Sequence, residues 1–183
     1  MEILTNLRTR LHQQLLKKEL PNFQMKRSSV FLDNAASIGL LFDATELEER
    51  LTVIGFAEKL KSLGKNVNLL GFFNTKLKTN DFPFHFFDKK QLDWALRPNK
   101  AVLANFVDQP FDLLINLSNR NVAPLNYIAA HSKARFRVGP YTQNTICYDL
   151  MIEHDKNKGL EAFLKLVLHY LERMQPTRKA AVV

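Results

Sequence analysis

Residues 37–73 read SIGLLFDATELEERLTVIGFAEKLKSLGKNVNLLGFF, and their pattern decides the fold. The short apolar run at 38–42 predicts a buried strand, and residues 67–73 predict a second one. Between them, residues 46–63 have the apolar spacing of a helix. Parallel strands need a long connection that is usually helical, so this stretch indicates a βαβ unit.

The ends and the buried face of this helix are also suggested by the sequence. Thr45 and Glu48 have the spacing of a capping box, and Gly64 stands where a C-terminal glycine is common. The apolar residues that fall near the helical period, and that we expect on one face, are Leu47, Leu51, Ile54, Phe56, Leu60 and Leu63.

The rest of the body continues the alternation of strands and helices. We expect an edge strand at 82–87, because Pro83 cannot donate to a neighbouring strand, followed by one or two helical turns at 88–96. Further strands are predicted at 111–117 and 135–139, and helices at 122–134 and 159–174. The predicted fold is an α/β, Rossmann-like three-layer sandwich with a mostly parallel sheet and right-handed crossovers.

An amphipathic helix is predicted at residues 2–20, before this body. Its apolar stripe is Ile3, Leu4, Leu7, Leu11 and Leu15, and Pro21 ends it. We divide the chain into a basic N-terminal helix and strap (1–36), a Rossmann-like domain (37–175) and a loose basic tail (176–183).

Composition excludes several classes of protein. The 183 residues include 26 Lys and Arg against 18 Asp and Glu, a net charge of +8, and 46% are hydrophobic, which excludes a largely disordered chain. A single cysteine, Cys147, excludes an internal disulfide. We find neither a signal peptide nor an apolar run long enough to span a bilayer, and expect a soluble, cytoplasmic protein.

Polar residues follow four of the predicted strands. They are Asp43 and Thr45 after the first, Asn74 after the second, Ser118, Asn119, Arg120 and Asn121 after the fourth, and Tyr141, Thr142 and Asn144 after the fifth. Ligands of open α/β sheets bind at the carboxyl ends of the strands, so we expect these residues to gather at one edge. An N-terminal turn of a helix with Arg120 beside it could hold a phosphate, although such residues also serve simply as caps and turns. The candidates are Asp43, Thr45, Ser118, Asn119, Arg120 and Asn121.

No catalytic residue, metal site or cofactor is assigned from the sequence. Cys147 could act as a nucleophile only beside a base such as His131 or His154, and a buried, inert thiol is the preferred interpretation. The five histidines lack the spacing of metal ligands, and no glycine-rich phosphate loop is present.

Positive charge is concentrated near the N-terminus. Residues 1–28 contain six basic and two acidic residues, a net +4 that is half of the total. Such an arm suits a polyanion such as RNA, although a solvated helix face is the simpler alternative. The helix lacks Trp and Phe on its apolar side, which argues against a membrane surface. The polyanion candidates are Arg8, Arg10, Lys17, Lys18, Lys26 and Arg27.

Residues 111–139, FDLLINLSNRNVAPLNYIAAHSKARFRVG, resemble the N-terminal Rossmann-like half of heptosyltransferase-type glycosyltransferases of the GT-B fold. Together with SIGLLFDATELEERL and the C-terminal helix, the block looks like a small bacterial single-domain family of unassigned function. The glycine-rich turn of the transferases is replaced here by residues 42–45, and only one such domain fits in the chain. The resemblance therefore implies at most a half-domain.

Two hypotheses for function follow. The first is a non-enzymatic module that docks on a larger assembly, such as a ribosome, through the basic arm. The alternative is a nucleotide or nucleotide-sugar binding protein, a degenerate or partnered glycosyltransferase-like half-domain. The apolar stripe of helix 2–20 could also form a homodimer.

Overall fold

The computed structural model describes residues 2–19, 30–77 and 81–174, with only the backbone for 2–6. Residues 26 and 27, the 176–183 tail and most of the predicted strap lie outside these ranges. The described elements, in chain order, are α1 (Glu2–Glu19), β1 (Ser37–Asp43), α2 (Leu47–Ser62), β2 (Asn66–Phe73), β3 (His85–Asp88), the 3-10 turn η2 (Lys89–Gln91), α3 (Lys100–Ala104), β4 (Leu113–Asn116), α4 (Ala123–His131), β5 (Phe136–Pro140), β6 (Leu150–Ile152), η3 (Lys156–Lys158) and α5 (Gly159–Arg173).

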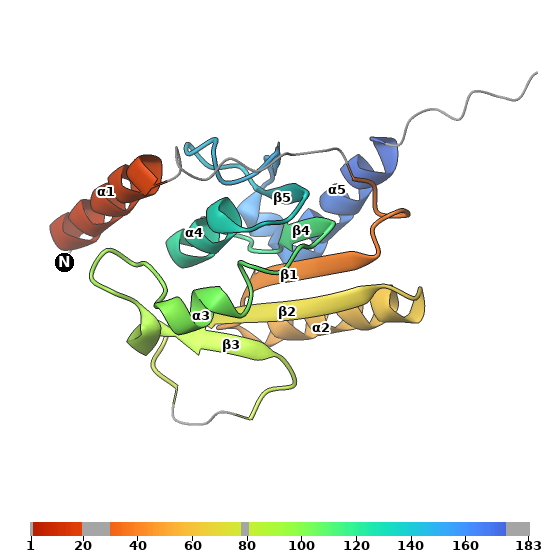
Figure 1. Ribbon diagram of the computed structural model, residues 1–183, viewed down its shortest axis with the longest axis horizontal. Coiled ribbons are helices and arrows are strands. Elements are labelled where there is room, and N and C mark those ends of the chain that lie inside the picture. Colours follow the sequence, from red (N-terminus) through yellow and green to blue (C-terminus); the bar gives the residue numbers. More distant parts are fainter. Residues whose placement is uncertain (1, 20–29, 78–80, 175–183) are drawn as a thin grey trace, which may run out of the picture.

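The centre of the fold is a six-stranded sheet in the order β3-β2-β1-β4-β5-β6, and every neighbouring pair is parallel (Figure 1). β1 and β4 are the two central strands, and β1 pairs along its whole length with β2 and over four residues with β4. The predicted α/β fold with an N-terminal helix is confirmed.

Each face of the sheet is covered by helices, which gives the three layers. Ile38, Leu40 and Phe42 of β1 belong to a core shared with α2 and α5. Leu41 faces the other way, into a second core with α1, α3 and α4. The strands are buried on both faces, which explains their continuous apolar runs.

The predicted buried face of α2 is correct for Phe56 and Leu60 but wrong for Leu47, Leu51 and Leu63, and the predicted capping box is wrong. Its buried residues are Val53, Phe56, Ala57 and Leu60. Leu47 and Leu51, by contrast, are 61% and 60% exposed, because they lie off that stripe. Thr45 does not cap the helix: the N-cap position is Glu46, which makes no capping bond, and the Thr45 hydroxyl bonds Asp43 instead. Gly64, at φ +77°, does follow the C-terminus as expected.

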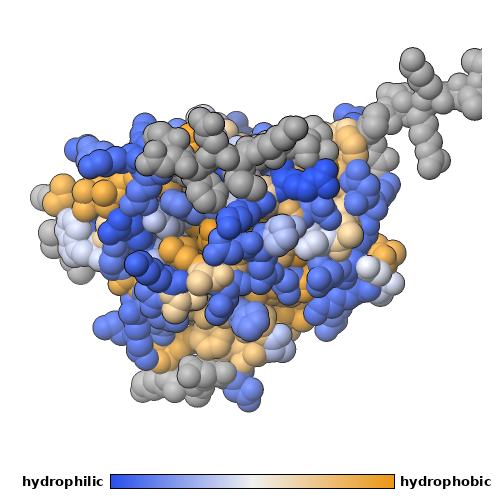
Figure 2. All heavy atoms as spheres, viewed as in Figure 1, coloured by the Kyte–Doolittle hydropathy of each residue, from blue (hydrophilic) through white to orange (hydrophobic). Residues whose placement is uncertain are grey.

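α1 also buries a different side from the one predicted. His12 and Leu16 are buried against the body, while Leu7 is 53% exposed and Leu11 and Leu15 are half-buried. Figure 2 shows the apolar surface that remains exposed over α1. The apolar surface of this helix that is exposed to a second copy of the chain therefore consists of Leu7 and the exposed parts of Leu11 and Leu15.

The close packing of β5 against the following loop gives a test of this arrangement. A Cβ at Gly139 would overlap the ring of Tyr148, whereas a Cβ at Gly55 of α2 would meet nothing within 4 Å. We expect Gly139→Ala to lower the free energy of unfolding by about 1–3 kcal/mol, because the core is overpacked. Gly55→Ala should leave it unchanged or raise it by up to about 1 kcal/mol. Urea denaturation measures both, and equal effects would contradict the packing described here.

Candidate functional site

A cleft of about 640 Å³ lies at the carboxyl ends of the central strands. β1 continues into α2 on one face of the sheet, whereas β4 continues into α4 on the opposite face. A crevice forms where neighbouring strands send their connections to opposite sides, and ligands of open α/β sheets bind there. The described part of the chain thus provides a site of the size typical of small-molecule pockets.

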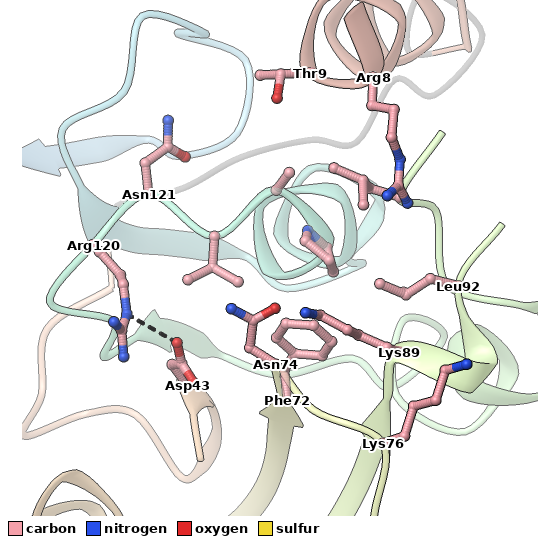
Figure 3. Close-up of a pocket in the computed structure, with 14 residues that line it drawn as sticks. Arg8, Thr9, Asp43, Phe72, Asn74, Lys76, Lys89, Leu92, Arg120 and Asn121 are labelled. Atoms are coloured by element: carbon pink, nitrogen blue, oxygen red, sulfur yellow. Dashed lines mark hydrogen bonds and ion pairs between the residues drawn. The ribbon is translucent and has the colours of Figure 1, made fainter. Parts of the chain in front are cut away.

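The cleft is lined by residues from several parts of the fold that reach this edge. They come from α1, from the ends of β1 and β2, from the turns after β2 and β3, and from the start of α4 (Figure 3). The lining residues are Arg8, Thr9, Asp43, Phe72, Asn74, Lys76, Lys89, Leu92, Leu96, Arg120, Asn121, Val122, Ala123 and Pro124.

The charge of this lining is strongly positive. Four cations, Arg8, Lys76, Lys89 and Arg120, face a single carboxylate, Asp43. Within the described ranges, Arg120 alone of the four forms an ion pair with a carboxylate. Lys89 extends towards Asn74 inside the cleft, and Lys76 lies at its edge (Figure 3). The cleft is therefore suited to an anion.

Asp43 and Thr45 connect the ends of β1 and β2. Asp43 is 2% exposed, and its Oδ1 accepts bonds from the Thr45 backbone N–H (3.0 Å) and hydroxyl (2.6 Å). The Thr45 Oγ1 in turn accepts from the backbone N–H of Asn74 at 2.9 Å. Asp43 lines the cleft. Thr45 does not, but its bonds to Asp43 and Asn74 hold the ends of β1 and β2 together.

Arg120 joins the loop after β4 to this group. Its Nε donates to Asp43 Oδ2 at 3.0 Å, and its Nη2 lies 3.8 Å from Glu49 Oε2. Burial raises the pKa of Glu49, and the Arg120 charge opposes that effect. Asn121, the next residue, also lines the cleft and accepts a bond from Asn126 Nδ2.

Ser118 and Asn119 lie away from the cleft. The buried Ser118 hydroxyl donates to Asn116 Oδ1 at 2.7 Å. The Asn119 amide donates to the carbonyl of Lys156, and its Oδ1 lies 3.0 Å from His154 Nε2. Of the six predicted residues, Asp43, Arg120 and Asn121 line the cleft. Thr45 does not line it but is hydrogen-bonded to Asp43.

α1 forms one wall of the cleft and is held by the loop that precedes α3. Arg8 Nε donates to the Trp94 carbonyl (2.8 Å), and His12 Nδ1 lies 2.9 Å from the Ala95 carbonyl. The loop is strained here, because Leu96 has φ +62°, a left-handed conformation that leucine rarely adopts. Glu19 accepts bonds from Arg97 (2.8 Å) and from the Tyr127 hydroxyl (2.7 Å).

Because α1 packs against the body, the residues predicted to bind a polyanion do not all lie on one surface. Arg8 points into the cleft (Figure 3), while Arg10, Lys17 and Lys18 are exposed on the outer side of α1. Lys26 and Arg27 lie outside the described residues.

Two cleft cations were missed in the sequence. Lys76 is the third residue after the end of β2, and Lys89 directly follows β3. Their positions after strand ends are the available signal. Recognising it required the position of β3 beside β2.

Cys147 is buried, and burial raises the pKa of its thiol to about 12. The thiolate that a nucleophile needs is therefore scarce at neutral pH. In the described ranges no group of three or more His, Cys, Asp and Glu side chains is placed to hold a metal ion.

The family model described as a family of unknown function (DUF6913) matches residues 8–174 of the chain. None of the curated proteins matches it, so the resemblance of residues 111–139 to heptosyltransferases has no support from them. Within the described ranges, none of the helices combines the length and apolar character needed to cross a bilayer.

The burial of His12 predicts a pH dependence of stability. Burial lowers the pKa of His12 below its ordinary value of 6.5, and it outweighs the hydrogen bond to the Ala95 carbonyl and the charges of Asp93 and Glu19, which raise the pKa. As the pH falls below 6.5, the unfolded state takes up this proton before the folded state, so stability decreases. His12→Asn keeps a donor for the Ala95 carbonyl but does not titrate. We expect a smaller drop in melting temperature between pH 7.5 and 5.5 in this variant than in the wild type.

His85→Asn is the matched control, because His85 is exposed on β3. It should retain the wild-type drop in melting temperature. An unchanged drop in His12→Asn would show that His12 is not buried in its neutral form.

Proposed function

The chain belongs to the DUF6913 family, whose function is unknown, and from the site itself we propose that it binds a nucleotide or nucleotide sugar in the cleft between α1 and the sheet. The observation that carries the proposal is the arrangement of Arg8, Lys76, Lys89 and Arg120 around one cleft of about 640 Å³. Phosphate groups are the common anions that need several such donors at once.

The start of α4 adds to the attraction for a phosphate. The N-terminus of this nine-residue helix lines the cleft, and Val122 at its N-cap position makes no side-chain bond to the first N–H groups. Pro124 has no N–H group, and the Leu125 N–H donates to the Val122 carbonyl. The Ala123 N–H and the helix dipole favour an anion at this end. With the four cations, they support a phosphate at the β4 side of the cleft.

The organic part of a nucleotide is accommodated by the apolar lining. Phe72, Leu92, Leu96 and Val122 line the same cleft as the cations. Ligand sites commonly combine an apolar wall with a few polar groups that fix the orientation of the ligand. This combination favours a phosphorylated organic molecule over inorganic phosphate alone.

We propose binding rather than catalysis. Asp43 is the carboxylate that lines the cleft, and both of its oxygens are already engaged by Thr45 and Arg120. A general base must instead accept a proton from the substrate. The nucleotide-sugar form of the proposal would make the chain a glycosyltransferase-like half-domain that acts with a partner, and it rests on the resemblance of residues 111–139.

A second proposal concerns the outer face of α1. Glu19 is turned towards Arg97 and Tyr127, so its charge is paired and does not offset Arg10, Lys17 and Lys18 on the exposed side. This cationic face supports docking on an RNA-containing assembly such as a ribosome. It is a different surface from the cleft, and so it can be tested separately.

Charge reversal at Lys89 tests the nucleotide proposal. We expect wild-type protein to bind ADP or UDP-glucose in isothermal titration calorimetry, and Lys89→Glu to bind at least about tenfold more weakly, because a charged hydrogen bond contributes about 1.5–3 kcal/mol. Lys59→Glu is the control: Lys59 is exposed near the end of α2, outside the cleft. The proposal fails if neither probe binds at millimolar concentration, or if the two variants bind equally.

Replacement of Arg10, Lys17 and Lys18 by Gln tests the RNA proposal. Each phosphate contact contributes about 0.7 to the slope of log affinity against log salt for single strands, so the triple variant should lose about 2 from that slope. Binding of total RNA at several salt concentrations measures it. Lys59→Gln should leave the slope unchanged, and a triple variant that binds RNA like the wild type would rule out this surface.

A further inference from the structure

A second, much smaller cavity adjoins the cleft. It has a volume of about 20 Å³ and lies between α1, the start of α4 and the loop before β6. Thr9, Asn121 and Ala123 line both spaces, so the two lie against each other at these residues. A space of this size holds one atom group as large as a water molecule.

Two polar atoms without partners belong to residues that line this cavity. His12 is 3% exposed and Asn144 is 7% exposed. Among the described residues, neither His12 Nε2 nor Asn144 Nδ2 has a hydrogen-bond partner. Leaving a buried polar atom unpaired costs about 1–3 kcal/mol, so two on one cavity indicate a common partner.

The two atoms have opposite hydrogen-bonding character. The Ala95 carbonyl can only accept, so the His12 Nδ1 beside it carries the hydrogen. Burial keeps the ring neutral, because it lowers the pKa of His12, and Nε2 is then an acceptor. Asn144 Nδ2 is a donor. A hydroxyl group satisfies both at once, since it donates one bond and accepts another.

The neighbouring amides are already occupied with one another. Asn116 Nδ2 donates to the Tyr148 hydroxyl (2.5 Å), which donates to Asn126 Oδ1 (2.6 Å). Asn126 Nδ2 donates to Asn121 Oδ1. This series of bonds fixes Asn121, which lines both the cleft and the small cavity, and it leaves His12 and Asn144 to their own partner.

We propose that the small cavity is a hydroxyl subsite of the cleft: it takes one ribose hydroxyl of the bound nucleotide, which donates to His12 Nε2 and accepts from Asn144 Nδ2. The inference rests on the proposed function and narrows the ligand to nucleotides with free ribose hydroxyls. The phosphates lie among the cations, while the ribose is recognised from the α1 side.

The test compares ADP and UDP with their 2′,3′-dideoxy analogues by calorimetry. For wild-type protein we expect the ribose forms to bind at least about tenfold more tightly, since the analogue leaves both buried atoms unpaired. Asn144→Leu has nearly the same shape and removes the donor without introducing a charge, and His12→Asn removes Nε2 but keeps a donor for the Ala95 carbonyl. In both variants the ratio of the affinity for the ribose form to that for the dideoxy form should fall towards one. The affinity for the dideoxy form should stay near the wild-type value, which also shows that the variants are folded.

The outcomes separate this inference from the proposed function. If ADP or UDP binds and Lys89→Glu weakens it, but the dideoxy analogue binds wild-type protein equally well, the subsite is overturned and the cavity holds water only. A tenfold preference that both variants retain also overturns it, because the hydroxyl is then recognised elsewhere. If no nucleotide binds wild-type protein, both proposals fail.

Discussion

The buried carboxylate of Asp43 constrains the whole edge of the sheet at which the cleft lies. A charge that is 2% exposed must be paired and hydrogen-bonded, because removing it from water is costly. Thr45 supplies two donors and Arg120 a third. The two partners come from different connections, so the hydrogen bonds of one carboxylate fix the loop after β1 and the loop after β4. Thr45 also accepts a bond from Asn74, which fixes the start of the loop after β2.

Much of the fold could be predicted from the sequence, because long apolar runs bury strands on both faces. The strands at 38–42, 67–73 and 111–117 and the α5 helix follow from such patterns. β6 and α3 could not be predicted, since three and five residues are too few to show a period. The buried stripe of α2 was misassigned because Leu47 and Leu51 fit the helical period as well as Val53 and Phe56 do, and only packing distinguishes them.

The site was predictable in part for the same reason. Asp43, Arg120 and Asn121 follow strands that were recognised, and parallel strands bring their ends together. Lys89 depended on placing β3 beside β2, which its short sequence does not settle. Arg8 was assigned to a solvent-facing arm, and its place in the cleft depends on a bond to the carbonyl of Trp94, 86 residues away. Such contacts arise from tertiary packing, which local periodicity does not report.

The docking of α1 has a thermodynamic consequence. The helix carries basic residues on two sides: Arg8 lines the cleft, while Arg10 and Lys18 are exposed on the outer side. It is attached through the Trp94 and Ala95 carbonyls and through Glu19, next to the strained backbone of Leu96. A molecule that contacts both Arg8 and the body stabilises the attachment of α1. By linkage, a partner that binds only when α1 is attached raises the affinity for that molecule by the same factor. α1 is thus placed to couple its inner and outer surfaces energetically.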